Sequence, residues 1–441
     1  MRRLYTLLLW LGLPLVSCSV LWRGLRERAY WQGWGERFGG GGALPVSGRD
    51  AADNLWIHAA SVGEVVAASP LVEALLQRHP GRALVITSTT PAGRARAAQL
   101  FGARVAARYA PYDLPLFVRR ALRRYRPALC VVIETELWPN FFALCARAQV
   151  PVLVASARLS ARTARVYQRF PGLLRAALAA NVEVAAQSAA DADRYRQLGV
   201  PPQRLHVTGN LKFDREPPPG VEARGAALRA QLAPRRALWV GGSTHDPEER
   251  YLLEAQRALQ DLPGGAPLLV LAPRHRPRFE SVAALLQDAG LRFMRRSTLG
   301  AGAAPEDLQV LLLDTIGELQ DFYAAADVVF VGGSMAPVGG HNLLEAAQLG
   351  LPVLGGVHQQ NAPDIARALL AVAALELVAD PAQLAAALRR WLGDAAARKA
   401  AGAAGRGVVL ANRGALAGVM ALLEPALASA PPAGSRASLP G

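Results

Sequence analysis

Hydrophobic residues in this chain gather in short runs that alternate with longer amphipathic stretches. In the first half, the runs with strand character are Asn54–His58, Ala83–Thr87, Arg104–Arg108, Leu129–Glu134, Val152–Ala155, Val182–Ala186 and Leu205–Val207. Most of the stretches between them repeat apolar residues every three or four positions, which is the helical period. This alternation predicts a parallel sheet that is covered by helices.

The second half repeats the pattern. Its strand candidates are Leu238–Gly241, Leu268–Leu271, Val310–Leu313, Val328–Val331, Pro352–Leu354 and Leu375–Val378. The segment between the halves contains the turn-forming run Pro217–Gly220 and lacks strand character. We therefore predict an α/β protein of two Rossmann-like domains. Such folds bind ligands outside the carboxyl ends of their strands, here in a cleft between the domains.

The predicted organisation has six parts along the chain. They are a membrane anchor with a basic juxtamembrane segment (1–38), an N-terminal domain (50–214), a linker (215–235), a C-terminal domain (236–398), closing helices (399–428) and a disordered tail (429–441). The tail is assigned from its composition, because Pro, Ser, Gly and Ala cannot build a packed core.

The segment from Leu4 to Trp22 is apolar and uncharged, and it has about the minimum length of a membrane-spanning helix. Arginines flank it on both sides, and tryptophans of the kind found at membrane interfaces lie within and after it. We predict an uncleaved anchor, followed by a basic stretch to Phe38 that lies on an anionic membrane surface. Whether the helix spans the membrane or lies on it is left open by the sequence.

A second interpretation of this segment is a lipoprotein signal peptide. Leu15-Val16-Ser17-Cys18 resembles a cleavage site of that kind, and cleavage there would place the protein outside the cytoplasm. The arginines downstream of Cys18 oppose export, so the anchor is favoured, with the protein on the cytoplasmic side.

Charge and cysteine content narrow the partners and the compartment. The formal net charge is +15, which favours anionic substrates or an anionic membrane face. Nucleic acid ranks below these partners, because the basic residues are dispersed and no aromatic-basic recognition pattern occurs. The three cysteines have neither disulfide-framework nor metal-type spacing, as expected for a reducing compartment.

Charged residues follow several predicted strands of the first half. Glu64 lies in the first turn of a helix after the first strand, where the helix dipole favours an ionised carboxylate that can act as a general base. Glu134 and Glu136 follow the fourth strand, and Lys212 ends the domain, where its charge can stabilise a transition state. Each has an ordinary alternative: helix-end charge, solvated loop acids and a surface lysine.

The second half carries candidate phosphate-binding turns. Arg274 follows a strand and can fork onto a phosphate. The runs Gly332–Ser334 and Gly339–Glu345 form a glycine-rich loop that leads into a helix, where backbone N–H groups can approach an anion. Glu345 lies one turn into that helix, within reach of ribose hydroxyls. A single loop of this kind is weak evidence for a phosphate-binding site, whereas several such loops in one half of the chain are stronger evidence.

We predict no metal site and no cofactor. Asp191 and Asp193 match the Asp-x-Asp metal motif of another glycosyltransferase fold. Here the pair opens a helix after Ser188, where Asp is a common capping residue. No histidine pair has ligand spacing.

Several motifs in this order resemble those of the Kdo transferases, enzymes that transfer 3-deoxy-D-manno-octulosonic acid (Kdo). The motifs are HAASVGE, TSTTPAG, IETELWPN, ARLSAR, GNLKFD, GSTH, PRH, DTIGEL and VGGSMAPVGGHNLLEAA. The resemblance covers almost the whole chain and implies the two-domain GT-B fold. It also implies an inverting transfer of Kdo from CMP-Kdo to the lipid A precursor lipid IVA, at the cytoplasmic face of the inner membrane.

The resemblance also implies roles for individual residues. Glu64 would be the base on the acceptor hydroxyl, with Glu134 and Lys212 as transition-state stabilisers. The residues implied to hold CMP are Pro273, Arg274, Ile316, Gly317, Glu318, Asn342, Leu343, Leu344 and Glu345. Three segments depart from the family pattern, namely Asp246–Glu248, Gly355–His358 and a Gly/Ala-rich stretch between Arg274 and Asp314.

Two other functions stay open on the sequence. One is a GT-B enzyme that uses a different nucleotide sugar in envelope lipid synthesis, which a panel of nucleotides would distinguish. The other is a catalytically silent, membrane-bound nucleotide-sugar binder, against which the intact Glu64, Glu134 and Lys212 argue.

Overall fold

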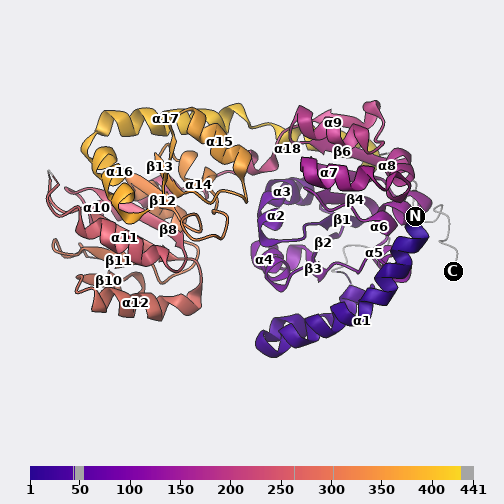
Figure 1. Ribbon diagram of the computed structural model, residues 1–441, viewed down its shortest axis with the longest axis horizontal. Coiled ribbons are helices and arrows are strands. Elements are labelled where there is room, and N and C mark those ends of the chain that lie inside the picture. Colours follow the sequence, from indigo (N-terminus) through magenta and orange to yellow (C-terminus); the bar gives the residue numbers. More distant parts are fainter. Residues whose placement is uncertain (43, 45–53, 263, 301, 429–441) are drawn as a thin grey trace. The chain divides into compact units, whose positions relative to one another are not determined.

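The computed structural model describes residues 1–42, 44, 54–262, 264–300 and 302–428, so the predicted tail 429–441 lies outside the described residues. The chain forms two compact units (Figure 1). The N-terminal unit contains residues 1–215 and the chain from residue 412 onward, and the C-terminal unit contains residues 216–411.

The N-terminal unit is built on a parallel sheet with the strand order β3-β2-β1-β4-β5-β6-β7. The strands are β1 (Asn54–His58), β2 (Leu84–Ser88), β3 (Ala106–Tyr109), β4 (Pro127–Ile133), β5 (Val152–Ala157), β6 (Val182–Ala186) and β7 (Leu205–Val207). The predicted strands of this half are confirmed, with ends that differ by one or two residues. In β3, a 3₁₀ turn over Gly102–Arg104 delays the start of the strand by two residues.

Both faces of this sheet are buried, and side-chain alternation along β1 shows why. Trp56 packs into the core on one face, whereas Leu55 and Ile57 pack into the core on the other. Successive side chains of a strand point to opposite faces, so a strand between two helical layers carries apolar residues on both faces, as Leu55, Trp56 and Ile57 do here. All five residues of β1 are buried.

The helices of the N-terminal unit cover this sheet (Figure 1). They are α1 (Arg2–Arg26), α2 (Val62–Ala67), α3 (Ser69–Arg78), α4 (Pro91–Phe101), α5 (Pro115–Tyr125), α6 (Pro139–Arg147), α7 (Ala161–Gln168), α8 (Arg175–Asn181), α9 (Ala189–Gln197) and α18 (Ala415–Ala428). Short 3₁₀ helices include η1 (Arg28–Trp31), η2 (Trp34–Phe38), η4 (Pro171–Leu173) and η6 (Leu211–Asp214).

The C-terminal unit has its own parallel sheet, in the order β10-β11-β9-β8-β12-β13-β14. Its strands are β8 (Leu238–Thr244), β9 (Leu268–Pro273), β10 (Phe293–Arg295), β11 (Val310–Leu312), β12 (Val328–Val331), β13 (Val353–Gly356) and β14 (Leu375–Val378). The edge strand β10 is absent from the sequence prediction. It has three half-buried residues, two apolar and one charged, which is too short a pattern to show a period.

Helices surround this second sheet. They are α10 (Val221–Leu232), α11 (Glu248–Arg257), α12 (Phe279–Asp288), α13 (Leu319–Ala325), α14 (Leu344–Ala347), α15 (Pro363–Ala371), α16 (Pro381–Gly393) and α17 (Ala395–Ala411).

Most of the predicted linker 215–235 is the helix α10, which packs on α13 within the C-terminal unit. Gly220 adopts a left-handed φ of 73° and ends the proline run, so that the helix begins at the next residue. Gly225 allows the close approach, since a Cβ there would lie 2.5 Å from the Cβ of Ala324. The segment is therefore part of a domain instead of a free connection.

The predicted closing helices 399–428 divide between the two units. The helix α17 belongs to the C-terminal unit, whereas α18 packs on α3 and on strands β4, β5 and β6 of the N-terminal unit. Val419, Met420 and Leu423 of α18 are buried in the N-terminal core. Asp214 fixes the start of α18, because its carboxylate accepts hydrogen bonds from Gly414 N (2.7 Å) and Leu416 N (3.0 Å).

By length and composition, two of the described helical stretches are apolar enough to cross a membrane. The first is α1, Arg2–Arg26, whose most apolar window has no buried residue. The second is Ala395–Ala428, of which 28% is buried and whose last helix, α18, completes a protein core. Of the two described stretches, only α1 has no buried residue in its most apolar window.

Candidate active site

Glu64 lies in the first turn of α2, directly after β1. Ser61 caps this helix by accepting a hydrogen bond from Glu64 N, and the Glu64 carboxylate accepts one from Ala60 N at 2.6 Å. This arrangement is similar to a capping box, except that the carboxylate accepts from Ala60, the residue before the N-cap Ser61. The side chain is thus held in one position at the carboxyl end of β1.

The pKa of Glu64 is raised to about 7. Burial is the largest cause, and the negative charge of Glu134 is the next. The helix dipole alone favours the ionised form, so the structure reverses the direction expected from the sequence. Burial disfavours any charged carboxylate, and a second acid nearby adds to the effect. A carboxylate that titrates near neutral pH is well matched to general base catalysis.

Glu134 and Lys212 form an ion pair beside Glu64. The Lys212 Nζ lies 2.7 Å from Glu134 Oε1, and both side chains are mostly buried. Glu134 follows β4 and adopts a left-handed backbone conformation with φ of 62°, which is unusual for a residue with a side chain. Such strain is found at functional sites, where the surrounding structure holds it. The three residues that the sequence singles out in the first half are therefore brought together.

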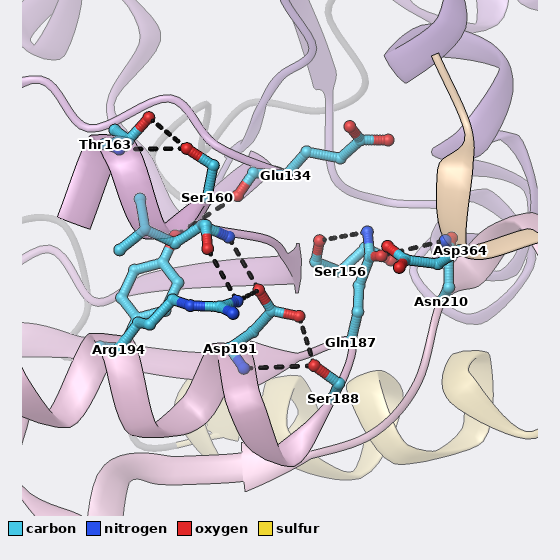
Figure 2. A network of polar contacts seen from close by, with 12 residues as sticks. Glu134, Ser156, Ser160, Thr163, Gln187, Ser188, Asp191, Arg194, Asn210 and Asp364 are labelled. Carbon is cyan, nitrogen blue, oxygen red and sulfur yellow. Dashed lines mark hydrogen bonds and ion pairs between the residues drawn. The ribbon is translucent and has the colours of Figure 1, made fainter. Parts of the chain in front are cut away.

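A polar network fixes the loop that carries Lys212 (Figure 2). Ser156 Oγ accepts a hydrogen bond from Leu211 N at 2.9 Å, and Asn210 Oδ1 accepts one from Lys212 N at 3.0 Å. Gln187 joins these two, since its Nε2 donates to Ser156 O and its Oε1 accepts from Asn210 Nδ2. Ser156 and Gln187 are not recognisable as site residues from the sequence, because each lies at a strand end and acts through a distant loop.

The rings of His58 and Trp138 pack together next to Glu136. Their rings lie 4.4 Å apart, and Trp138 Nε1 donates a hydrogen bond to Glu136 Oε2 at 2.7 Å. Burial lowers the pKa of His58 to about 4, so it is neutral at physiological pH. The Glu136 carboxylate is therefore held by the indole of Trp138.

Asp191 has a structural role. It caps α9 with Ser188, and its carboxylate also accepts hydrogen bonds from Leu159 N and Arg194 Nη1, both at 3.0 Å (Figure 2). Asp193 lies on the surface, paired with Arg196. Across the described residues, no group of three or more His, Cys, Asp or Glu side chains is placed to hold a metal. These contacts agree with the capping role expected for Asp191.

In the C-terminal unit, Arg274 follows β9 next to three histidines. His245 Nε2 and His341 Nε2 lie 2.8 Å apart, and the ring of His275 lies 5.2 Å from that of His245. Burial lowers the pKa of all three, and the charge of Arg274 lowers them further, with His341 at about 3. Neutral imidazoles can donate and accept hydrogen bonds, so positive charge at this place comes from arginine.

The remaining predicted nucleotide-binding residues lie on two loops of the same unit. Ile316 is exposed and Gly317 has a left-handed φ of 100°, while Glu318 accepts a hydrogen bond from Arg296 Nη2 at 2.8 Å. Asn342 Nδ2 donates to Glu345 Oε1 at 3.2 Å at the start of α14. Burial raises the pKa of Tyr323; the charge of Glu345 raises it further and the charge of Arg274 lowers it.

The glycine-rich loop after β12 binds a carboxylate of the protein itself. Glu248 is fully buried, and it accepts hydrogen bonds from the backbone N–H groups of Gly333 (2.7 Å), Ser334 (2.9 Å), Met335 (2.8 Å) and Ala336 (3.2 Å). A fifth comes from His245 N at 2.9 Å. The expectation that the N–H groups of Gly332–Ser334 receive a phosphate is therefore wrong for Gly333 and Ser334. These N–H groups bind Glu248 and so hold the loop in its conformation. Glu248 belongs to the segment 246–248, which departs from the family pattern.

Comparison with known proteins identifies the family. A family profile described as 3-deoxy-D-manno-octulosonic-acid transferase (kdotransferase) matches residues 32–215. The 3-deoxy-D-manno-octulosonic acid transferase of Haemophilus influenzae is 38% identical over 430 residues, covering 97% of this chain and 99% of that protein. The protein of the same name from Bordetella pertussis is 39% identical over 416 residues, covering 88% and 95% of the two chains.

Solved structures agree on the fold. The UDP-GlcNAc 2-epimerase of Neisseria meningitidis bound to UDP-GlcNAc aligns with a TM-score of 0.54 over 84% of this chain and 100% of that chain. At 14% identity, this likeness concerns the two-domain GT-B architecture alone. The sequence relatives show that this chain belongs to the Kdo transferase family of glycosyltransferases.

Proposed function

We propose that this protein transfers Kdo from CMP-Kdo to the lipid A precursor lipid IVA, with inversion at the anomeric carbon, in lipopolysaccharide biosynthesis. The observation that carries the proposal is the grouping of Glu64 with the Glu134–Lys212 ion pair, in a chain whose relatives are named Kdo transferases. Glu64, with a pKa near 7, accepts the proton of the acceptor hydroxyl. The hydroxyl oxygen then bonds to the anomeric carbon as the bond to the CMP phosphate breaks.

The other two residues stabilise charge in this scheme. Lys212 supplies a positive charge as negative charge develops at the reacting centre, and Glu134 holds its ammonium group in place. A donor that is already activated by CMP leaves with its phosphate. The protein then needs a base and cationic stabilisers, and it needs no covalent nucleophile.

The nucleotide is assigned to the C-terminal unit. Arg274 forks onto the phosphate, and Pro273 with Ile316–Glu318 and Asn342–Glu345 encloses the cytidine and ribose. The buried Glu248 supports this assignment indirectly, because it holds rigid the loop that precedes Asn342. CMP-Kdo and lipid IVA are both anionic, which fits the net charge of +15.

We place the protein at the cytoplasmic face of the inner membrane, attached by its N-terminal helix. The support is the uncovered apolar helix α1 and the arginines around it. The direct test of the whole function is a transfer assay with CMP-Kdo and lipid IVA, read by product mass. Transfer from another nucleotide sugar but not from CMP-Kdo would favour the other GT-B activity, and absence of turnover with retained CMP binding would favour the silent binder.

The rate of transfer should depend on the protonation of Glu64. Below pH 7, kcat/KM should rise about tenfold per pH unit, because only the deprotonated carboxylate accepts a proton, and it should level off above the pKa. The measurement is a pH profile of kcat/KM for the lipid acceptor. In Glu134→Gln, the neighbouring negative charge is gone, so the midpoint should move to lower pH. A flat profile, or an unchanged midpoint in this variant, would contradict the assignment.

Glu345→Ala should weaken CMP binding by roughly 1.5–3 kcal/mol, the range for a hydrogen bond to a charged group. Glu345 lies half-buried at the start of α14, and its Oε1 accepts a hydrogen bond from Asn342 three residues earlier, so the fold should hold. Calorimetric titration with CMP measures the loss, and repeating it with a chelator should give the same affinity. Glu376→Ala, which removes an acid on the strand β14, serves as the control. Unchanged CMP affinity would remove Glu345 from the site.

A further inference from the structure

The helix α1 turns one apolar face to solvent along its whole length. At 100° per residue, its most exposed large residues fall within an arc of about 100°. They are Leu4, Leu7, Leu8, Leu11, Leu15, Trp22 and Leu25, with between 53% and 75% of their surface exposed. The opposite face, which includes Leu13, Val20 and Gly24, is partly or fully buried. The helix is therefore two-sided, with one side toward the protein and one without protein cover.

The first turns of α1 are attached to the N-terminal unit by polar contacts. The Tyr5 hydroxyl donates a hydrogen bond to Asp113 Oδ2 at 3.0 Å, and Thr6 Oγ1 lies 3.1 Å from Asn140 Oδ1. Asp113 is itself part of the fold, because it also accepts from the N–H groups of Asn140 and Phe141 at the start of α6. Moving this end of the helix away would break both contacts.

The other end of α1 leads back to the same unit within a few residues. The Tyr109 hydroxyl donates to Ala29 O at 3.0 Å. Glu36 is then buried, where it accepts hydrogen bonds from Arg94 Nε (3.1 Å) and Tyr109 N (2.8 Å). The ring of Phe38 packs 5.1 Å from that of Phe117, which also contacts Trp10 of α1. Figure 1 shows α1 running along the outside of the N-terminal unit.

We infer that α1 lies in the plane of the membrane surface, with its Leu4–Leu25 face in the lipid and both of its ends on the cytoplasmic side. With 25 residues it is about 37 Å long, enough to cross a hydrocarbon core of about 30 Å. Crossing would put Tyr5 and Ala29 on opposite sides of the bilayer. Both contact one folded unit, so a spanning helix is incompatible with these contacts.

The positive charges around α1 indicate that the lipid in contact with its apolar face is anionic phospholipid. Arg23 and Arg26 lie in the last turn of the helix, and Arg26 stacks on the Trp22 ring at 4.3 Å. Beside η2, an open hollow is lined by Gly35, Phe38, Gly39, Gly40, Arg120, Arg123 and Arg124. Arginines next to an apolar face are the composition of helices that lie at the headgroup level of anionic membranes. This inference rests on the membrane attachment in the proposed function, and it adds the orientation of α1 relative to the membrane.

Cysteine labelling from each side of the membrane tests the topology. In a full-length Cys18→Ser background, Cys130 and Cys145 are buried, so an added Arg3→Cys or Arg28→Cys is the reactive thiol. A membrane-impermeant maleimide should label both variants in inverted inner-membrane vesicles, and should label neither in intact spheroplasts until detergent is added. Labelling of the two positions from opposite sides would overturn the inference. Recovery of the protein in the soluble fraction would instead refute the membrane attachment itself.

Nitroxide labels on the exposed face give a second, independent readout. In vesicles of phosphatidylethanolamine and phosphatidylglycerol, labels at Leu4, Leu15 and Leu25 should show similar depth by collision with oxygen and a water-soluble nickel complex. A spanning helix would make Leu15 much deeper than the other two. A label at Leu13, on the partly buried face, is the matched control and should be shallower than Leu15. Equal depth at Leu13 and Leu15, both deep, would refute the in-plane placement.

Discussion

Replacing Glu64 with glutamine should lower the rate of Kdo transfer about 10²–10⁴-fold, the usual contribution of a positioned general base. Glutamine keeps the shape of the side chain but cannot accept the proton. It also serves in a capping box, so the start of α2 should stay intact. The melting temperature should therefore hold, and CMP affinity should barely change, because the predicted nucleotide contacts are in the other unit. Single-turnover transfer, calorimetry with CMP and thermal melting measure the three quantities.

Glu64→Ala separates the catalytic role from the capping role. It removes the base and also the hydrogen bond from Ala60 N, so it should lose both activity and about 0.5–2 kcal/mol of stability. Glu64→Gln should lose activity alone. Near wild-type transfer by the glutamine variant would leave Glu64 as a helix cap, and the base would then be sought at Glu134 or Glu136.

Lys212→Met should lower the transfer rate about 10²–10³-fold, comparable to the loss of one transition-state donor. The substitution keeps an unbranched side chain and removes the charge. It also leaves Glu134 without its ion-pair partner beside Glu64. The unbalanced negative charge should raise the pKa of Glu64 further, so the midpoint of the pH profile should move to higher pH. Measuring kcat across pH checks both effects.

The chain provides a matched control for this substitution. Its other lysine, Lys399, is exposed on α17, so Lys399→Met makes the same chemical change away from the site and should leave the rate unchanged. The double variant Lys212→Met with Glu134→Gln should restore the pH midpoint without restoring the rate. An equal loss in both lysine variants, or an unshifted midpoint in Lys212→Met, would exclude Lys212 from the reaction.

The sequence by itself determined the two sheets and the family. Strands that are buried on both faces are rich in apolar residues, so β1, β6, β12 and β14 are visible at their observed boundaries. The acids and the lysine that follow these strands are local features, and parallel topology brings the carboxyl ends of strands to one edge. Their grouping was therefore predictable, and the structure places Glu134 and Lys212 in contact.

Tertiary structure alone decided which distant segments complete each unit. The sequence of α18 reads as one more alanine-rich helix, and its place in the N-terminal core follows from contacts with β4 to β6. The edge strand β10 is too short to show a period, and its pairing with β11 defines it. The helix α10 is hidden in a proline-rich stretch, because its packing on α13 is a non-local interaction.

The same limit applies to electrostatics. Helix position alone predicts an ionised Glu64, yet burial and Glu134 raise its pKa to about 7. Glycines after β12 suggest a phosphate loop, yet Glu248, more than 80 positions earlier, takes up the N–H groups. Local sequence specifies which side chains are present and which secondary structure carries them. Burial and the neighbouring charges set their protonation and their free donors, and both arise only when remote parts of the chain pack together.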